Sequence, residues 1–174
     1  MRRLALYSAS ACLVLSLLVN VASYFGISLF EKFVFLHFGI FLLGIPAAFS
    51  AKNRNIRKSP WWPPGAGFRA LTEGGPTWGS KALIGGYVYA LIQFVALLVL
   101  SQAGTPAIRD GKYILHSHGR LIRELTETEY GWQLAHVSRM FSAGWALFYL
   151  FFIIWYWSPR AKPTDVSGRP SREP

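Results

Sequence analysis

Apolar residues lie in long blocks along this chain, and short polar segments separate the blocks. A soluble domain of 174 residues would instead spread its apolar positions at the period of helices or strands. A helix needs ~20 apolar residues to cross the ~30 Å hydrocarbon layer of a bilayer. Backbone groups in lipid must also pair within their own segment, which favours helix. The pattern predicts an all-α membrane protein with four transmembrane helices, over about residues 4–25, 33–50, 82–102 and 134–157.

The first block follows Arg2 and Arg3, and it begins as a secretion signal does. Its apolar run is longer than the central region of a signal peptide, and no small-x-small cleavage site follows it. We therefore expect a retained helix. Cys12 lies within this block and has no second cysteine with which to form a disulfide.

Lysine and arginine are divided unevenly between the two sides of such a topology. Twelve of the 18 fall at the N-terminus, between the second and third blocks, or after the fourth block, and six fall on the other side. Because these residues accumulate in cytoplasmic loops, both termini are expected in the cytoplasm. The net charge of +10 then reflects topology and gives no reason to expect nucleic-acid binding. The tail over 158–174 is polar and rich in Pro, Ser and Arg, so we expect disorder there.

Residues 103–133, between the third and fourth blocks, form the expected extracytoplasmic cap. Lys112–His116 is rich in β-forming residues, and Ser117–Gly119 supplies a turn in which Gly119 can take a positive φ. Leu121 and Ile122 continue the apolar pattern after the turn. A small β-hairpin is therefore predicted in the cap.

A helix start follows the predicted hairpin. Thr126 and Glu129 have the spacing of a capping box, in which each side chain bonds the backbone N–H of the other residue. No proline lies between Thr126 and Met140. The predicted helix therefore runs unbroken to Trp157, and its first three or four turns stand outside the lipid.

The four histidines are the candidates for binding a cofactor. His37 lies inside the second block, where an imidazole is costly unless it is paired, and His136 lies near the outer start of the fourth block. Two histidines on facing helices can hold a b-type haem. His116 and His118 form an H-x-H pair that reaches one metal if both lie in a strand, but not if a turn begins between them. Neither pair has further ligands at a recurring spacing, so we expect no cofactor, and His37 is then expected to bond a neighbouring helix.

Polar residues in or near the predicted spans are few, and most lie toward the outer leaflet. There they can line a small cavity, bond a neighbouring helix, or extend to the headgroups. The spans contain no acidic residue, which an ion path usually needs, and this argues against a proton-coupled transporter. The residues are Asn20, His37, Gln93 and Arg139.

Charged and aromatic residues of the cap are candidates for binding another protein. Exposed charge influences partner choice and association rate. The sequence contains no motif for nucleophilic catalysis, no zinc-protease motif and no P-loop, so an enzyme is not expected. The candidate interaction residues are Arg120, Arg123, Glu127, Tyr130 and Trp132.

The stretch DGKYILHSHGRLIRELTETEY, Asp110–Tyr130, resembles a segment that precedes the last membrane helix of small bacterial inner-membrane proteins of unknown function. The likeness continues into FSAGWALFY at Phe141–Tyr149 and covers about a quarter of the chain. It implies a multi-pass protein of the bacterial inner membrane with its cap in the periplasm. It implies no activity, cofactor or catalytic residue.

These observations favour a non-enzymatic accessory or interaction protein of the inner membrane. Its partners would be the lipid bilayer and another membrane or periplasmic protein, bound through the cap or the helices. An immunity protein or an assembly factor would belong to this class. The alternatives are a redox or metal-binding membrane subunit that uses the histidines, and a small transporter or channel.

Overall fold

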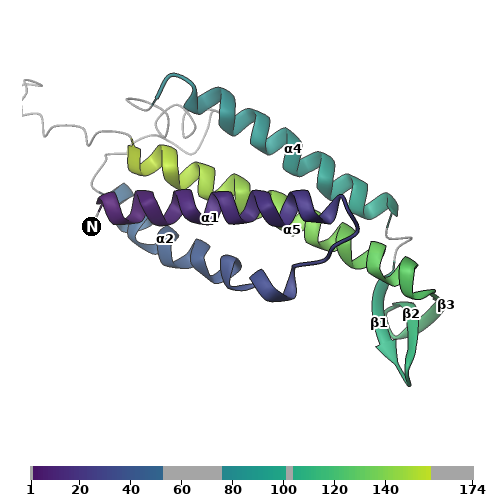
Figure 1. Cartoon of the computed structure of the whole chain (residues 1–174). Coiled ribbons are helices and arrows are strands. Elements are labelled where there is room, and N and C mark those ends of the chain that lie inside the picture. The colour runs from purple at the N-terminus through teal and green to yellow at the C-terminus, as the bar shows by residue number, and fades with distance from the viewer. Residues whose placement is uncertain (1, 53–75, 101–103, 158–174) are drawn as a thin grey trace, which may run out of the picture.

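The computed structural model describes residues 2–52, 76–100 and 104–157. The predictions for the loop over 53–75 and for the tail over 158–174 lie outside the described residues. The described chain is mainly helical, with a small sheet at one end (Figure 1). The helices are α1 (Arg2–Ser23), a 3₁₀ turn η1 (Glu31–Phe33), α2 (Phe35–Lys52), α4 (Gly79–Leu100) and α5 (Glu127–Trp157).

Three of these helices, α1, α4 and α5, are long and apolar enough to cross a membrane. They correspond to the first, third and fourth predicted spans, because each apolar block ends at a clear change to polar residues. Helix α5 begins several residues before its predicted span, where the capping box predicts its start. Helix α2 occupies the second predicted span, and its crossing of the membrane stays a prediction.

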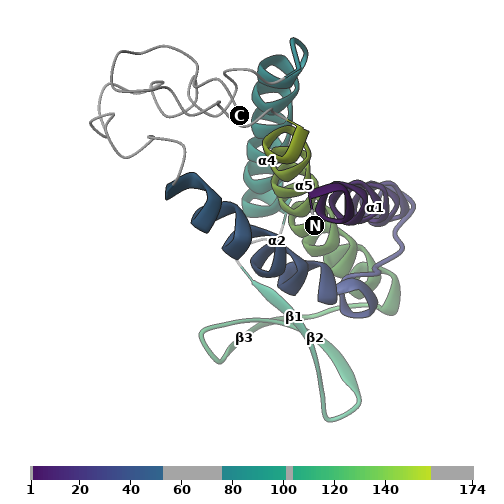
Figure 2. The same cartoon turned by 90° about the vertical axis from the view of Figure 1, so that its left-hand side faces the viewer.

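Helix α5 contacts each of the other three helices, and its contact with α1 is the most extensive (Figures 1 and 2). Its large side chains Trp145, Tyr149 and Phe152 are buried in a core that also includes Val19 of α1 and Leu36 of α2. Lipid tails are as apolar as the helices, so close side-chain packing holds such a bundle together. The other helices are therefore arranged around α5.

Two glycines allow α2 to approach α5 closely. A Cβ at Gly39 would overlap the hydroxyl of Tyr149, which donates a hydrogen bond to the carbonyl oxygen of Leu36. A Cβ at Gly44 would lie 3.4 Å from the ring of Phe152. Both positions are small because an aromatic side chain of α5 lies against the backbone of α2.

The cap contains a three-stranded antiparallel sheet, one strand more than the predicted hairpin. The predicted hairpin corresponds to the second and third strands, and the first strand is additional. The strand order in the sheet follows the chain, with β1 (Thr105–Arg109), β2 (Lys112–Ser117) and β3 (Arg120–Glu124).

Both connections in the sheet are two-residue turns with left-handed backbone. Asp110 and Gly111 have φ angles of 51° and 74°, and His118 and Gly119 have φ angles of 49° and 81°. Two successive residues with positive φ match the right-handed twist of paired strands. The positive φ predicted for Gly119 is thus confirmed, and the turn includes His118.

The capping box predicted for the start of α5 is also confirmed. The backbone N–H of Glu129 donates to Thr126 Oγ1 at 3.2 Å, and the backbone N–H of Thr126 donates to Glu129 Oε2 at 2.8 Å. The helix then continues for 31 residues to Trp157, about 46 Å at 1.5 Å per residue. One continuous element therefore joins the cap to the far end of the bundle.

Candidate functional site

The strand register assigns the side chains of the sheet to two faces. Directly opposed residues of antiparallel strands share a face, and successive residues alternate between faces. The face that carries the contacts to α5 is called the α5-side face, and the opposite one the outer face. The α5-side face carries Pro106, Ile108, Tyr113, Leu115, Ser117, Arg120 and Arg123; the outer face carries Thr105, Ala107, Arg109, Lys112, Ile114, His116, Leu121 and Glu124.

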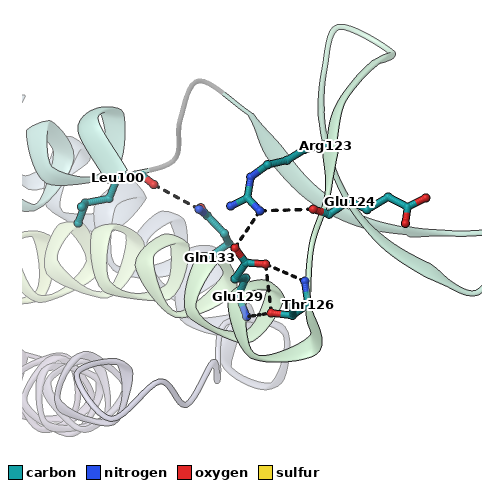
Figure 3. A network of polar contacts seen from close by, with 6 residues as sticks. All are labelled: Leu100, Arg123, Glu124, Thr126, Glu129 and Gln133. Atoms are coloured by element: carbon teal, nitrogen blue, oxygen red, sulfur yellow. Dashed lines mark hydrogen bonds and ion pairs between the residues drawn. The ribbon is translucent and has the colours of Figure 1, made fainter.

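Two contacts of the α5-side face fix the sheet to the first turn of α5. The rings of Tyr113 and Tyr130 have centroids 4.9 Å apart. Arg123 Nη1 lies 2.8 Å from Glu129 Oε1 (Figure 3). Leu115, on the same face, is fully buried. The cap is therefore held on α5 by aromatic, ionic and apolar contacts together.

Glu129 takes part in both the helix cap and this ion pair (Figure 3). The hydrogen bond from the Thr126 backbone, and then the one from Arg123, lower the pKa of the Glu129 carboxyl below its usual value. Arg123 also donates to the carbonyl oxygen of Glu124, at 3.3 Å. The local structure thus depends on the ionised form of Glu129.

Gln133 joins α5 to the end of α4. Its Nε2 donates at 3.2 Å to the carbonyl oxygen of Leu100, the last residue of α4 (Figure 3). Carbonyl groups in the last turn of a helix have no partner within the helix, so this bond satisfies one of them. The neighbouring Trp132 is 44% exposed, and its ring packs against Gly26, after the end of α1.

The outer face presents an apolar side chain among charges of both signs. Leu121 is 59% exposed. Lys112 Nζ and Glu124 Oε1 form an ion pair of 2.6 Å on this face. An exposed ion pair of this kind contributes little to stability. Arg120 is also exposed, but it pairs with Ser117 and therefore lies on the α5-side face.

Neither edge of the sheet is suited to pairing with a further strand. Arg109 and Lys112 form the hydrogen-bonded pair that closes the turn, and such pairs alternate with non-bonded pairs along antiparallel strands. At Pro106 a backbone N–H would therefore point away from β2, and proline has no N–H. On β3 the register shifts opposite Leu115 and His116, so that Ile122 forms a bulge. Prolines and bulges hinder edge-to-edge pairing. A partner of the cap is therefore expected to contact a face of the sheet.

The two histidines of the H-x-H pair lie in different local structures. His116 lies in β2, and its Nδ1 is buried without a hydrogen-bond partner. His118 lies in the turn that follows, so the alternation of a strand does not align the two side chains. Within residues 2–52, 76–100 and 104–157, no group of three His, Cys, Asp or Glu side chains is placed to hold a metal.

His37 and His136 have different neighbours. Trp145 Nε1 donates to His37 Nδ1 at 3.3 Å, which joins α2 to α5 as expected of a histidine that bonds a neighbouring helix. His136 lies beside Trp132, with ring centroids 6.4 Å apart. No contact recorded among the described residues brings these two histidines together, and the haem site stays a prediction.

Asn20 of α1 forms hydrogen bonds with two other helices. Its Nδ2 donates to the carbonyl oxygen of Arg139 at 3.0 Å and to Ser142 Oγ at 2.9 Å, both on α5. Its Oδ1 accepts a hydrogen bond from the hydroxyl of Tyr89 on α4, at 2.5 Å. The buried amide is thus satisfied at both ends, as a polar group inside a helix bundle must be.

Gln93 extends this network along α4. Its Nε2 donates to the hydroxyl of Tyr24 at 2.9 Å, and the hydroxyls of Tyr24 and Tyr89 lie 3.2 Å apart. The apolar pattern of the sequence did not single out the two tyrosines. Tyr89 and Gln93 are four residues apart and therefore share one face of α4, which is the signal that could have linked them.

Arg139 is directed at the end of α1. Its Nη2 and Nε donate to the carbonyl oxygen and to Oγ of Ser23, at 2.8 and 3.2 Å. Its guanidinium carbon lies 3.9 Å from the centre of the Tyr24 ring. Three of the four predicted polar residues, Asn20, Gln93 and Arg139, therefore belong to one packed network. That network holds helices together.

The sheet and the hydrogen-bond network of Asn20, Gln93 and Arg139 are thus the two main polar parts of a largely apolar bundle. The resemblance of Asp110–Tyr130 to segments of bacterial inner-membrane proteins stays a prediction. Comparisons of the chain with protein families, with curated proteins and with solved structures find no match.

Proposed function

We propose that this chain is a non-enzymatic multi-pass protein of a bacterial inner membrane that binds a periplasmic part of another protein through the outer face of its sheet. The apolar helices α1, α4 and α5 support a membrane location. The excess of lysine and arginine at both termini and between the second and third blocks supports cytoplasmic termini. When α2 is counted as a span together with α1, α4 and α5, the cap lies in the periplasm.

The exposure of Leu121 is the observation that carries the proposal. This side chain is 59% exposed on a sheet whose other face is fixed to α5. A rigidly supported apolar side chain loses little conformational freedom when it is bound. Because the sheet edges are unsuited to pairing, the outer face is the surface through which the cap can bind a protein.

The proposed partner has an apolar pocket for Leu121 and charges of both signs around it. The ion pair of Lys112 with Glu124 stands at the rim of the contact, whereas Arg120 lies on the α5-side face. Charges at a rim mainly raise the association rate and exclude wrong partners. Of the interaction residues predicted from the sequence, Arg123 and Tyr130 hold the cap on α5 and receive a structural role.

Photocrosslinking in the cells that produce the protein tests the proposal. A benzophenone amino acid replaces Leu121 in one variant and Ile108 in a control, which has a matching exposure of 60% on the opposite face. We expect a discrete adduct with one polypeptide from position 121 and none from position 108. Equal adducts from both positions, or none from either, would contradict the proposal.

A binding measurement then tests whether the captured polypeptide is a true partner. The full chain in nanodiscs is titrated with that purified polypeptide, and Leu121→Asp is compared with the wild-type chain. We expect an affinity loss of at least about tenfold, or about 1.4 kcal/mol, because the hot-spot residues at the centre of an interface contribute about 2 kcal/mol or more. An unchanged affinity would show that the adduct was a chance encounter.

A further inference from the structure

The outer end of α4 marks the level of the bilayer surface. Its 22 residues measure about 33 Å, close to the ~30 Å hydrocarbon layer, and they stay apolar to Leu100. Gln133 bonds Leu100, and the exposed Trp132 is of a type enriched at membrane interfaces. Glu127 lies six residues from Gln133, about 9 Å along α5. The sheet joined to this first turn therefore lies at the depth of the headgroups.

The sheet also projects sideways from the end of the bundle. Both views show its strands extending past the outline of the helices (Figures 1 and 2). Its α5-side face is turned toward α5, as the contact of Tyr113 with Tyr130 shows. In a membrane, the part of this face that reaches beyond the helices has phospholipid next to it.

Ile108 is the exposed apolar side chain of that projecting face. It lies opposite Tyr113 in the sheet and is 60% exposed. Arg109 follows it at the tip of the hairpin, and its side chain makes no hydrogen bond or ion pair with the described residues. An exposed aliphatic side chain next to an unpaired cation has the chemistry of a contact with phospholipid, because the first suits acyl chains and the second suits phosphate.

We propose that the β1–β2 hairpin rests on the outer leaflet, with Ile108 at the boundary of glycerol and acyl chains and Arg109 at lipid phosphates. Arg109 starts from the outer face, and its long side chain reaches the headgroups around the tip. The sheet then has lipid beside the projecting part of its α5-side face, and Leu121 stays exposed on the outer face. This contact sets the tilt of the sheet so that Leu121 points away from the membrane. The inference rests on the proposed membrane topology and not on the proposed protein partner.

A fluorescence measurement tests the lipid contact without any partner protein. Single cysteines replace Ile108 or Leu121 in a Cys12→Ala background, and each carries an environment-sensitive label. The full chain is reconstituted in vesicles of phosphatidylethanolamine and phosphatidylglycerol, with or without lipids that carry a nitroxide at the headgroup or at a shallow acyl position. We expect a blue-shifted emission that loses intensity with nitroxide lipids at position 108, and neither effect at position 121.

Two further variants distinguish an incorrect lipid contact from an incorrect membrane topology. A cysteine in place of His118, at the exposed turn, reports topology through labelling by a membrane-impermeant maleimide from the periplasmic side only. Arg109→Gln is expected to reduce the quenching at position 108 in vesicles rich in phosphatidylglycerol. Equal quenching at positions 108 and 121, or none at either, in a chain with the expected maleimide labelling overturns the lipid contact. Labelling from the cytoplasmic side overturns the topology itself.

Discussion

Arg139 and Ser23 join the middle of α5 to the end of the antiparallel α1: Nη2 of Arg139 donates to the carbonyl oxygen of Ser23, the last residue of α1, at 2.8 Å. The opposite end of the pair has the reciprocal arrangement. There Arg2 of α1 donates to the carbonyl oxygens of Tyr156 and Trp157, at 2.5 and 2.7 Å. Each helix thus supplies a cation for carbonyl groups at the C-terminus of the other.

Removing the donors of Arg139 is expected to destabilise this helix pair. Arg139→Met keeps the aliphatic length, and we expect it to lower the free energy of unfolding by about 1.5–3 kcal/mol, the range for hydrogen bonds to charged groups. Reversible unfolding in mixed micelles measures the loss. Arg139→Lys retains the charge and should recover part of it. An unchanged stability in Arg139→Met would mean that the guanidinium is solvated and does not hold α1.

The hydrogen bond of Asn20 with Tyr89 is expected to couple α1 to α4. In a double-mutant cycle of Asn20→Ala and Tyr89→Phe, we expect a coupling energy of about 0.6–1.7 kcal/mol, as for other hydrogen bonds between membrane helices. Tyr87→Phe is the matched control, because Tyr87 is on the same helix and is 60% exposed. A cycle with Tyr87 should give no coupling, and a comparable coupling there would point to a general effect of the α4 substitutions.

Acid is expected to loosen the join between the sheet and α5. Because folding lowers the pKa of the Glu129 carboxyl, its carboxylate stabilises the fold at pH values above the usual glutamate pKa, and this stabilisation is lost as the pH falls through the lowered value. Glu129→Gln should therefore reduce hydrogen-exchange protection at Thr126 near neutral pH, and the difference from wild type should shrink in acid. Glu127→Gln is the control from the same turn. Equal loss of protection in both variants would argue against a specific role of Glu129.

Glycine substitutions test the close contact of α2 with α5. Gly39→Ala places a Cβ against the Tyr149 hydroxyl, and we expect it to cost about 1–3 kcal/mol, the range for overpacking. Gly85→Ala on α4 meets nothing within 4 Å. That variant should be neutral or more stable by up to about 1 kcal/mol, because alanine favours helix over glycine. Thermal unfolding of the two variants compares them directly, and equal effects would mean that α2 does not pack as described.

Local signals in the sequence predicted local structure well. The capping box of Thr126 and Glu129 was found because its two residues are three positions apart and bond each other directly. The strand β1 was missed because Pro106 is a typical strand breaker, and only its place on an edge makes it acceptable. The helices α1, α4 and α5 were found from the length of their apolar blocks, which needs no knowledge of packing.

Contacts between helices were harder to predict than the helices themselves. Arg139 has the position of a residue that extends to the headgroups, and its bond to Ser23 depends on where α1 ends beside α5. Likewise, the hydrogen bonds of Tyr24 with Tyr89 and Gln93 depend on how α1 and α4 are rotated about their axes. A sequence lists which side chains need a partner, but the partner is set by the relative position of two helices, which no short pattern encodes.

The pairing of α1 with α5 joins two segments that are synthesised far apart in time. Asn20 leaves the ribosome well before Ser142, and α1 lacks its most extensive interface until α5 is complete at Trp157. At a synthesis rate of about 5–20 residues per second, the interval from Ser23 to Trp157 lasts roughly 7–27 s. During that time the amide of Asn20 lacks its two hydrogen bonds to α5 and has only Tyr89 of α4 as a partner among those it has in the finished bundle. The largest interface among the described helices therefore assembles last.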